Sequence, residues 1–228
     1  MPKMFSWAFI GIAAVFFIFF SSIVALITDW WWFTEVGFTD IFNKSLATKV
    51  IVGFTTGLFA AVFLLTNFFL SAHSKIPWML AIPEALIGQP MSLNDRLVKK
   101  LGIVVCLIVA SFIGLVAASS WQDVLKFVLA APFGQTDPLF GRDIAFYVFS
   151  LPVYSLTLGL IRTLIVLSLI LSGTIYILRG SLNLSNPDPQ ARLHMSVLLF
   201  LFLVTIAIGT HLSLYNLLIT QSGPVFGA

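Results

Sequence analysis

The sequence has very little charge for its length. Only 9% of its 228 residues are Asp, Glu, Lys or Arg, whereas 59% are hydrophobic. A soluble domain carries roughly 25% charged residues, so most of this surface must face something other than water. The shortage of charge predicts an integral membrane protein, and a mean hydropathy of +1.05 agrees with that prediction.

Cysteine and histidine are also scarce. The one cysteine, Cys106, lies within an apolar run, which excludes a disulfide framework and a cysteine-based metal site. The three histidines, His73, His194 and His211, are far apart and lack the spacing of metal ligands. The sequence therefore predicts no metal site.

Catalytic motifs are missing as well. The patterns HExxH, GxxxxGK[ST] and GxSxG do not occur, and no long apolar segment holds a pair of carboxylates. We therefore expect no enzymatic activity within these residues and predict no cofactor. The net charge of +3 does not indicate a nucleic-acid partner, because the Lys and Arg residues are scattered over several loops, as membrane topology requires.

Five apolar segments are long enough to span a membrane. A spanning helix needs about 20 mostly apolar residues, and continuous apolar runs favour helices, whose backbone groups are paired within the segment. The segments are residues 5–27, 46–71, 96–119, 153–178 and 192–219. The sequence thus predicts an all-α membrane protein, a bundle of about five transmembrane helices in a single domain over residues 1–228.

Small and polar residues inside these segments indicate contacts between helices. Gly53 and Gly57 form a small-xxx-small pattern, which allows two helices to approach closely. Polar side chains that we expect to hydrogen-bond between helices are those of Asn67, Ser111, Ser168 and Ser172.

Two shorter segments are expected to lie at the membrane surface. Residues 77–87 are apolar except for Glu84. Residues 121–131 have apolar positions at helical spacing, with polar residues such as Asp123 and Lys126 on the opposite face. Amphipathic helices too short to span a bilayer lie in its interface.

The distribution of basic residues predicts the orientation of the chain. The side that holds the N-terminus carries Lys3, Lys75, Arg96, Lys99, Lys100, Arg179 and Arg192. The opposite side carries fewer, namely Lys44, Lys49, Lys126 and Arg142. Because cytoplasmic loops hold the excess of Lys and Arg, we expect a cytoplasmic N-terminus and a C-terminus on the other side.

Residues 131–152 differ in composition from the apolar runs around them. Helix-breaking residues occur at Pro132, Gly134, Pro138 and Gly141, and such residues specify particular turns. The same stretch holds a charge cluster of Asp137, Arg142 and Asp143. We expect a structured outer loop. The cluster fits either a cation or lipid-headgroup site or, as the favoured interpretation, local roles in which Asp143 caps the next helical turn.

Arg162 is the most unusual residue of the predicted spans. It lies about ten residues into its segment, roughly 15 Å deep at about 1.5 Å per residue. An Arg near the bilayer centre costs at least about 2.5 kcal/mol by insertion scales, so it should face the bundle. His211 lies at a similar depth in the last span, and Tyr215 is one turn further out. These three residues form a candidate intramembrane polar cluster.

The cluster has more than one interpretation. It fits a proton or anion path or a bound lipid headgroup. The favoured alternative is that Arg162 pairs with an acidic residue of the outer face or reaches the interface, because no acid lies within a span to complete a relay. A bound pigment at His211 stays open, although a structural, hydrogen-bonded histidine is the preferred reading.

Several motifs together resemble a known family. Residues 29–42 (DWWWFTEVGFTDIF), 137–149 (DPLFGRDIAFYVF) and 223–228 (GPVFGA) resemble segments of the large bacterial membrane proteins called uncharacterised protein family 0182. The resemblance implies about seven spans followed by a large extracytoplasmic domain, so this chain looks like an N-terminal portion. It also implies a bacterial cytoplasmic (inner) membrane location, and it carries no established activity.

The leading functional hypothesis is a non-enzymatic structural or accessory subunit that packs against partner membrane proteins or lipids. The alternative is a transporter or channel component with a polar site around Arg162 and His211. A water-filled path to Arg162 would favour the alternative, whereas a dry, paired Arg162 would count against it.

Overall fold

The computed structural model describes residues 20–73, 95–182 and 188–219. The chain forms two compact units, Met1–Thr48 and Lys49–Ala228. The described residues are helical apart from turns and one isolated bridge between Thr136 and Asp143. The prediction of an all-α membrane protein is confirmed.

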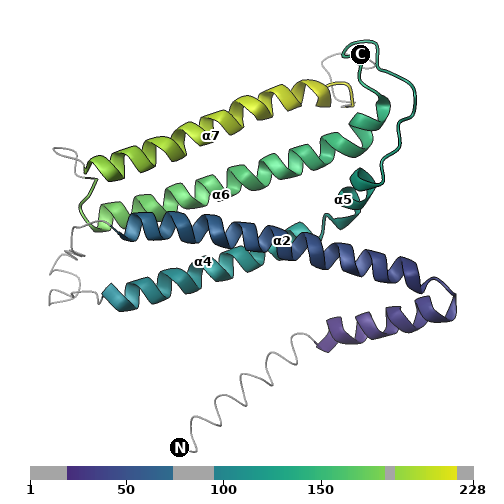
Figure 1. Ribbon diagram of the computed structural model, residues 1–228, viewed down its shortest axis with the longest axis horizontal. Coiled ribbons are helices and arrows are strands. Elements are labelled where there is room, and N and C mark those ends of the chain that lie inside the picture. Colours follow the sequence, from purple (N-terminus) through teal and green to yellow (C-terminus); the bar gives the residue numbers. More distant parts are fainter. Residues whose placement is uncertain (1–19, 74–94, 183–187, 220–228) are drawn as a thin grey trace, which may run out of the picture. The chain divides into compact units, whose positions relative to one another are not determined.

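Four described helices are long and apolar enough to cross a membrane (Figure 1). They are α2 (Thr39–Ala72), α4 (Asp95–Ala118), α6 (Leu151–Leu178), which directly continues the π-helix η1 (Phe146–Ser150), and α7 (Pro189–Asn216). The expected first span, residues 5–27, lies outside the described residues except for its last part, which is helical. The expected surface helix at residues 77–87 lies outside them entirely.

In the first unit, a helix covers residues 20–35 and so continues beyond residue 27 through the Trp cluster. Gly37 ends it with a φ of 77°, and the N–H of Phe38 donates to the carbonyl of Phe33 at 2.8 Å. That bond and the left-handed glycine form a Schellman cap. The next helix, α2, starts at Thr39 rather than residue 46, with Asp40 suiting its positive N-terminal end.

The core of the second unit is formed by α2, α4 and α6. Ala60, Leu64 and Phe68 of α2 pack with Cys106 of α4 and Leu164 of α6, all almost fully buried. Burial of these side chains between helices explains why the unit has a defined core although most of its surface is apolar.

Helices α2 and α4 approach closely at their glycines. A Cβ atom on Gly114 of α4 would lie 2.6 Å from the carbonyl oxygen of Gly53 and 3.1 Å from Cα of Gly57. The small-xxx-small pattern of α2 therefore faces a matching glycine on α4, and backbone-to-backbone contact replaces side-chain packing there.

The remaining elements of the second unit are close to their predicted positions. The amphipathic helix α5 covers Trp121–Val128, three residues shorter than expected, and Lys49 Nζ lies 5.0 Å from the centre of the Trp121 ring. Helix α6 carries Pro152 at its start, directly after the π-helix η1. Helices α6 and α7 run side by side (Figure 1), and Asp188 caps the start of α7.

Candidate functional site

Arg162 projects from α6 onto the backbone of α7. Its Nη2 donates a hydrogen bond to the carbonyl oxygen of Thr205 at 2.8 Å. Its Nε is buried and has no hydrogen-bond partner among the described residues. The side chain as a whole is half-buried. The guanidinium therefore lies in the α6–α7 seam with donors to spare.

A glycine makes room for this guanidinium. A Cβ atom on Gly209 would lie 2.5 Å from Nη2 of Arg162 and 3.5 Å from Cδ2 of Leu158. Gly209 is also one helical turn beyond Thr205, so its missing side chain leaves the Thr205 carbonyl open to a second donor. We call the Thr205 carbonyl and the space left by Gly209 the seat of the Arg162 guanidinium.

No carboxylate compensates the charge of Arg162 in the part of the chain that the structure describes. The spanning segments of α4, α6 and α7 contain no Asp or Glu between residues 96–118, 146–178 and 189–216. The ion pair present in the described residues joins Lys126 to Asp123 on the surface, 3.9 Å apart. A neutral carbonyl oxygen is the partner that the structure gives to this cation.

The structure places His211 and Tyr215 in a group separate from Arg162. Thr205 and His211 are six residues apart, roughly 9 Å along the helix at about 1.5 Å per residue. His211 is exposed, and its ring meets that of Tyr215 edge-on with 5.5 Å between centroids. Among the described contacts, no hydrogen bond joins Arg162 to His211. The three residues proposed as one cluster therefore occupy two places.

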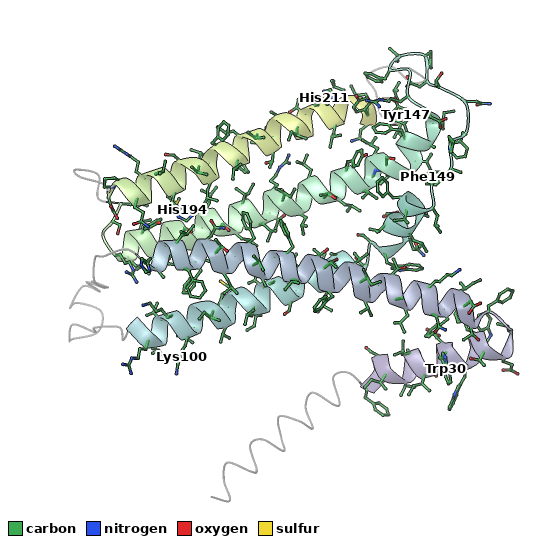
Figure 2. All side chains as sticks on the ribbon, in the orientation of Figure 1. Trp30, Lys100, Tyr147, Phe149, His194 and His211 are labelled. Atoms are coloured by element: carbon green, nitrogen blue, oxygen red, sulfur yellow. The ribbon has the colours of Figure 1, made fainter. Side chains whose placement is uncertain are left out.

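Tyr215 belongs to an aromatic clamp that holds the outer loop. We use this name for the rings of Phe140, Phe146, Tyr147 and Tyr215, which are in contact at centroid distances of 4.9–6.3 Å. Figure 2 shows Tyr147 and His211 at the same end of the α6–α7 pair, opposite His194. The clamp joins the loop to the end of α7, which explains how an irregular segment keeps one conformation.

Asp143 folds the beginning of the outer loop onto its end. Its carboxylate accepts hydrogen bonds from the backbone N–H groups of Phe133 at 3.1 Å, Gly134 at 2.9 Å and Ala145 at 2.7 Å. The bond from Ala145, more than any other contact, lowers the pKa of this carboxyl below its ordinary value. The bond to Ala145 is also the capping role favoured from the sequence.

Asp137 is still more fully bonded. Its Oδ1 accepts the N–H groups of Leu139 at 2.8 Å and Phe140 at 2.7 Å, and its Oδ2 accepts the Arg142 N–H at 3.0 Å and the Tyr147 hydroxyl at 2.7 Å. Partial desolvation raises the pKa of Asp137, but these four hydrogen bonds outweigh it and lower the pKa to about 2. Four donors use about all the lone-pair sites of a carboxylate.

The charged side chains of the outer loop therefore make their contacts within the loop and the helical turn that follows it. The Arg142 guanidinium stacks over the Phe146 ring at 5.4 Å, where a cation and an aromatic face attract each other. With the oxygens of Asp137 occupied and three N–H groups on Asp143, the geometry favours local hydrogen bonding over cation binding. The described residues contain no group of His, Cys, Asp and Glu side chains that could hold a metal ion.

A second polar network, not predicted as a unit, joins α2, α6 and α7. Asn67 Oδ1 lies 2.9 Å from His194 Nε2, and His194 Nδ1 lies 3.0 Å from the Tyr176 hydroxyl. Asn67 donates its Nδ2 to the Phe63 carbonyl, so Oδ1 must accept from Nε2–H. A neutral His194 then accepts a hydrogen bond at Nδ1 from the Tyr176 hydroxyl. The bonds run in one direction, from Tyr176 through His194 to Asn67.

The sequence held a partial signal for this network. Asn67 is expected from the sequence to hydrogen-bond between helices, but nothing in the sequence predicts His194 as its partner. In an up-and-down bundle, the end of α2, the end of α6 and the start of α7 meet on one side of the membrane. A polar residue near each of these ends is the signal that identifies the network.

Four long apolar helices define the class: the chain is an all-α integral membrane protein. It belongs to the Uncharacterised protein family (UPF0182), whose profile matches residues 6–228. This finding confirms the resemblance carried by the aromatic and Asp-Pro-Leu-Phe-Gly-Arg-Asp motifs.

Similar proteins share the whole of this region. The chain is 33% identical over 223 residues to a UPF0182 protein of Geotalea uraniireducens, which matches 95% of this chain and 25% of that relative. It is 36% identical over 215 residues to one of Pelobacter propionicus, with 91% and 24% covered. The chain thus spans about a quarter of the length of the curated relatives it matches. No solved structure is significantly similar to it.

Proposed function

We propose that this chain is a non-enzymatic membrane scaffold, a structural or accessory part of an assembly that packs against partner membrane proteins and lipids. One observation carries the proposal: large apolar side chains are exposed on segments outside the spans. Val128 and Leu129 at the end of α5 and Leu139 in the outer loop are 70–72% exposed. Exposed apolar groups on a fixed surface mark a site of protein or membrane contact.

The hydrogen-bonded polar side chains of the second unit support the same function. The carboxylates of the outer loop and the side chains of Asn67 and His194 are used in hydrogen bonds within the chain. Side chains with these internal hydrogen bonds stabilise the fold. The exposed apolar side chains of α5 and the outer loop are then the surface available to partners.

We further propose a bacterial cytoplasmic membrane location, with the N-terminus in the cytoplasm and the C-terminus outside. The excess of Lys and Arg on the N-terminal side supports this orientation. The Asn67–His194–Tyr176 network is consistent with it, because it requires the end of α2, the end of α6 and the start of α7 to share one side.

The scaffold proposal is tested by changing the exposed apolar surface. In the protein extracted gently from its own membrane, the double variant L129S/L139S should lose its partner in native mass spectrometry. The matched variant L129V/L139V keeps the surface apolar and should retain the assembly. A wild-type protein without any protein partner, or an unchanged assembly in L129S/L139S, would contradict the proposal.

The alternative function is a transporter or channel component, and it rests on Arg162. The buried Nε of that residue has no partner among the described residues, so its N–H is left to donate a hydrogen bond to an anion that passes between α6 and α7. Loss of a solute flux in R162Q, with folding and assembly intact, would favour this alternative over the scaffold.

A further inference from the structure

The guanidinium of Arg162 stays at the bilayer depth of its own position on α6. Arg162 is 16 residues from each end of the continuous helical span Phe146–Leu178, and Thr205 is 11 residues from the end of α7 at Asn216. At about 1.5 Å per residue, Arg162 is therefore at the middle of its span, roughly 24 Å from either end, and Thr205 is roughly 16 Å from the end of α7. A hydrocarbon core is about 30 Å thick. The guanidinium bonds Thr205 at mid-depth and does not extend along the helix to an interface.

The seat fixes the cation but does not neutralise it. A guanidinium has five N–H donors, and the structure assigns one of them to the Thr205 carbonyl. Intramembrane Arg residues are paired or face water, because an isolated charge in hydrocarbon is unstable. No Asp or Glu of the described spans lies at this depth.

The surroundings favour a carboxylate on a helix over a soluble anion. The apolar cavity between α2 and α4, about 560 Å³ in volume, is lined by residues such as Gly57, Ala110 and Leu115 and does not reach Arg162. On the side of α7 that holds Thr205, the exposed surface is apolar, with Leu201 38% and Ile208 46% exposed. Such a surface suits a packed helix better than an aqueous path.

We propose that Arg162 is the docking point for a membrane-spanning helix of a partner protein, a helix that carries an Asp or Glu at mid-bilayer depth. The charges are complementary, and the carboxylate accepts the donors that Thr205 leaves unused. Arginine suits this role because its planar fork binds a carboxylate through two parallel bonds. This inference rests on the proposed scaffold function and names the chemistry of its partner.

A carboxyl-directed cross-link in native membranes of the full-length protein tests the pairing. In R162K, a membrane-soluble carbodiimide such as dicyclohexylcarbodiimide converts the partner's carboxyl into an O-acylurea. The lysine amine attacks it, an amide bond forms, and dicyclohexylurea leaves. Mass spectrometry of the linked peptides should identify an acidic residue of another spanning helix.

Two control variants match this experiment. R162Q has no amine and should give no link. T163K places an amine at the same depth but on the next exposed position around α6, where Thr163 bonds its own helix, and should give none either. A folded R162K without a link, a link equal to that of T163K, a link to an acid of the same polypeptide, or a link to a fatty acid would overturn the inference.

A second pair of variants keeps Arg162 in place and so does not depend on R162K folding. G209A puts a methyl group 2.5 Å from Nη2 and should displace the guanidinium, whereas G159A on α6 meets nothing within 4 Å. In native mass spectrometry, G209A should lower the partner-bound fraction and G159A should not. Equal retention in both variants would refute the docking point. It would leave the scaffold proposal intact, because that proposal is tested separately by the wild-type assembly and by L129S/L139S.

Discussion

Replacing Tyr176 with Phe removes one hydroxyl from the network that joins three helices, and its cost follows from the geometry. The half-buried His194 Nδ1 loses its donor at 3.0 Å. Tyr176 is 1% exposed, so neither water nor another side chain takes the place of the hydroxyl. The variant should therefore unfold more easily than the wild type.

The magnitude is bounded from two directions. A buried acceptor left without its donor costs about 1–3 kcal/mol in soluble proteins. Interhelical hydrogen bonds in membranes average about 0.6 kcal/mol and reach about 1.7 kcal/mol. Because the site is closed to water, we expect a loss near the upper membrane value, about 1.5 kcal/mol, which is roughly a tenfold change in the unfolding equilibrium.

The assay is reversible unfolding of the purified protein in lipid bicelles, with Y154F as the matched control. Tyr154 is 45% exposed and is held by ring contacts with Phe127 and Phe146, so its hydroxyl should contribute little. Equal stability of Y176F and Y154F would refute the reasoning. So would ¹⁵N NMR spectra in which His194 carries its proton on Nδ1, since the network requires it on Nε2.

Two further predictions concern the outer loop and the α2–α4 crossing. Because folding lowers the pKa of Asp137 from 3.8 to about 2, its contribution to loop stability is complete above pH 3.8 and is lost as the pH falls towards 2. Hydrogen exchange of the Phe140 and Arg142 amides should show this loss, and a D137N variant that keeps the same profile would contradict it. G114A puts a Cβ 2.6 Å from the Gly53 carbonyl and should destabilise the protein by about 1–3 kcal/mol through overpacking. In a thermal unfolding assay, G159A should be near wild type, and a G114A variant as stable as G159A would show that the two helices can separate freely.

The helices were predictable because apolar composition is a local property of each segment. Their ends were less so. Lys44 and Lys49 lower the local hydropathy and hide the first turns of α2, although nothing there stops a helix. The π-helix from Phe146 precedes α6 and extends its span beyond the predicted start at residue 153, although the sequence did favour Asp143 as the cap of the next helical turn.

The candidate site was likewise predictable only in part. The cost of a charge in hydrocarbon singles out Arg162 from sequence alone. Its partner is a backbone carbonyl, which every residue has, so the sequence carries no signal for Thr205 beyond the nearby Gly209. His211 and Arg162 share a predicted depth, but depth does not say which face of a helix meets which neighbour.

By itself, the sequence determines the membrane class, the family, the segments that form helices and the presence of one costly cation among them. These follow from composition and spacing, which act over a few turns of chain. Tertiary structure alone decided that Arg162 lies on Thr205, that Tyr215 clamps the outer loop, and that Tyr176, His194 and Asn67 form one hydrogen-bonded line. The physical reason is that such contacts depend on how helices far apart in the chain are rotated and packed against one another.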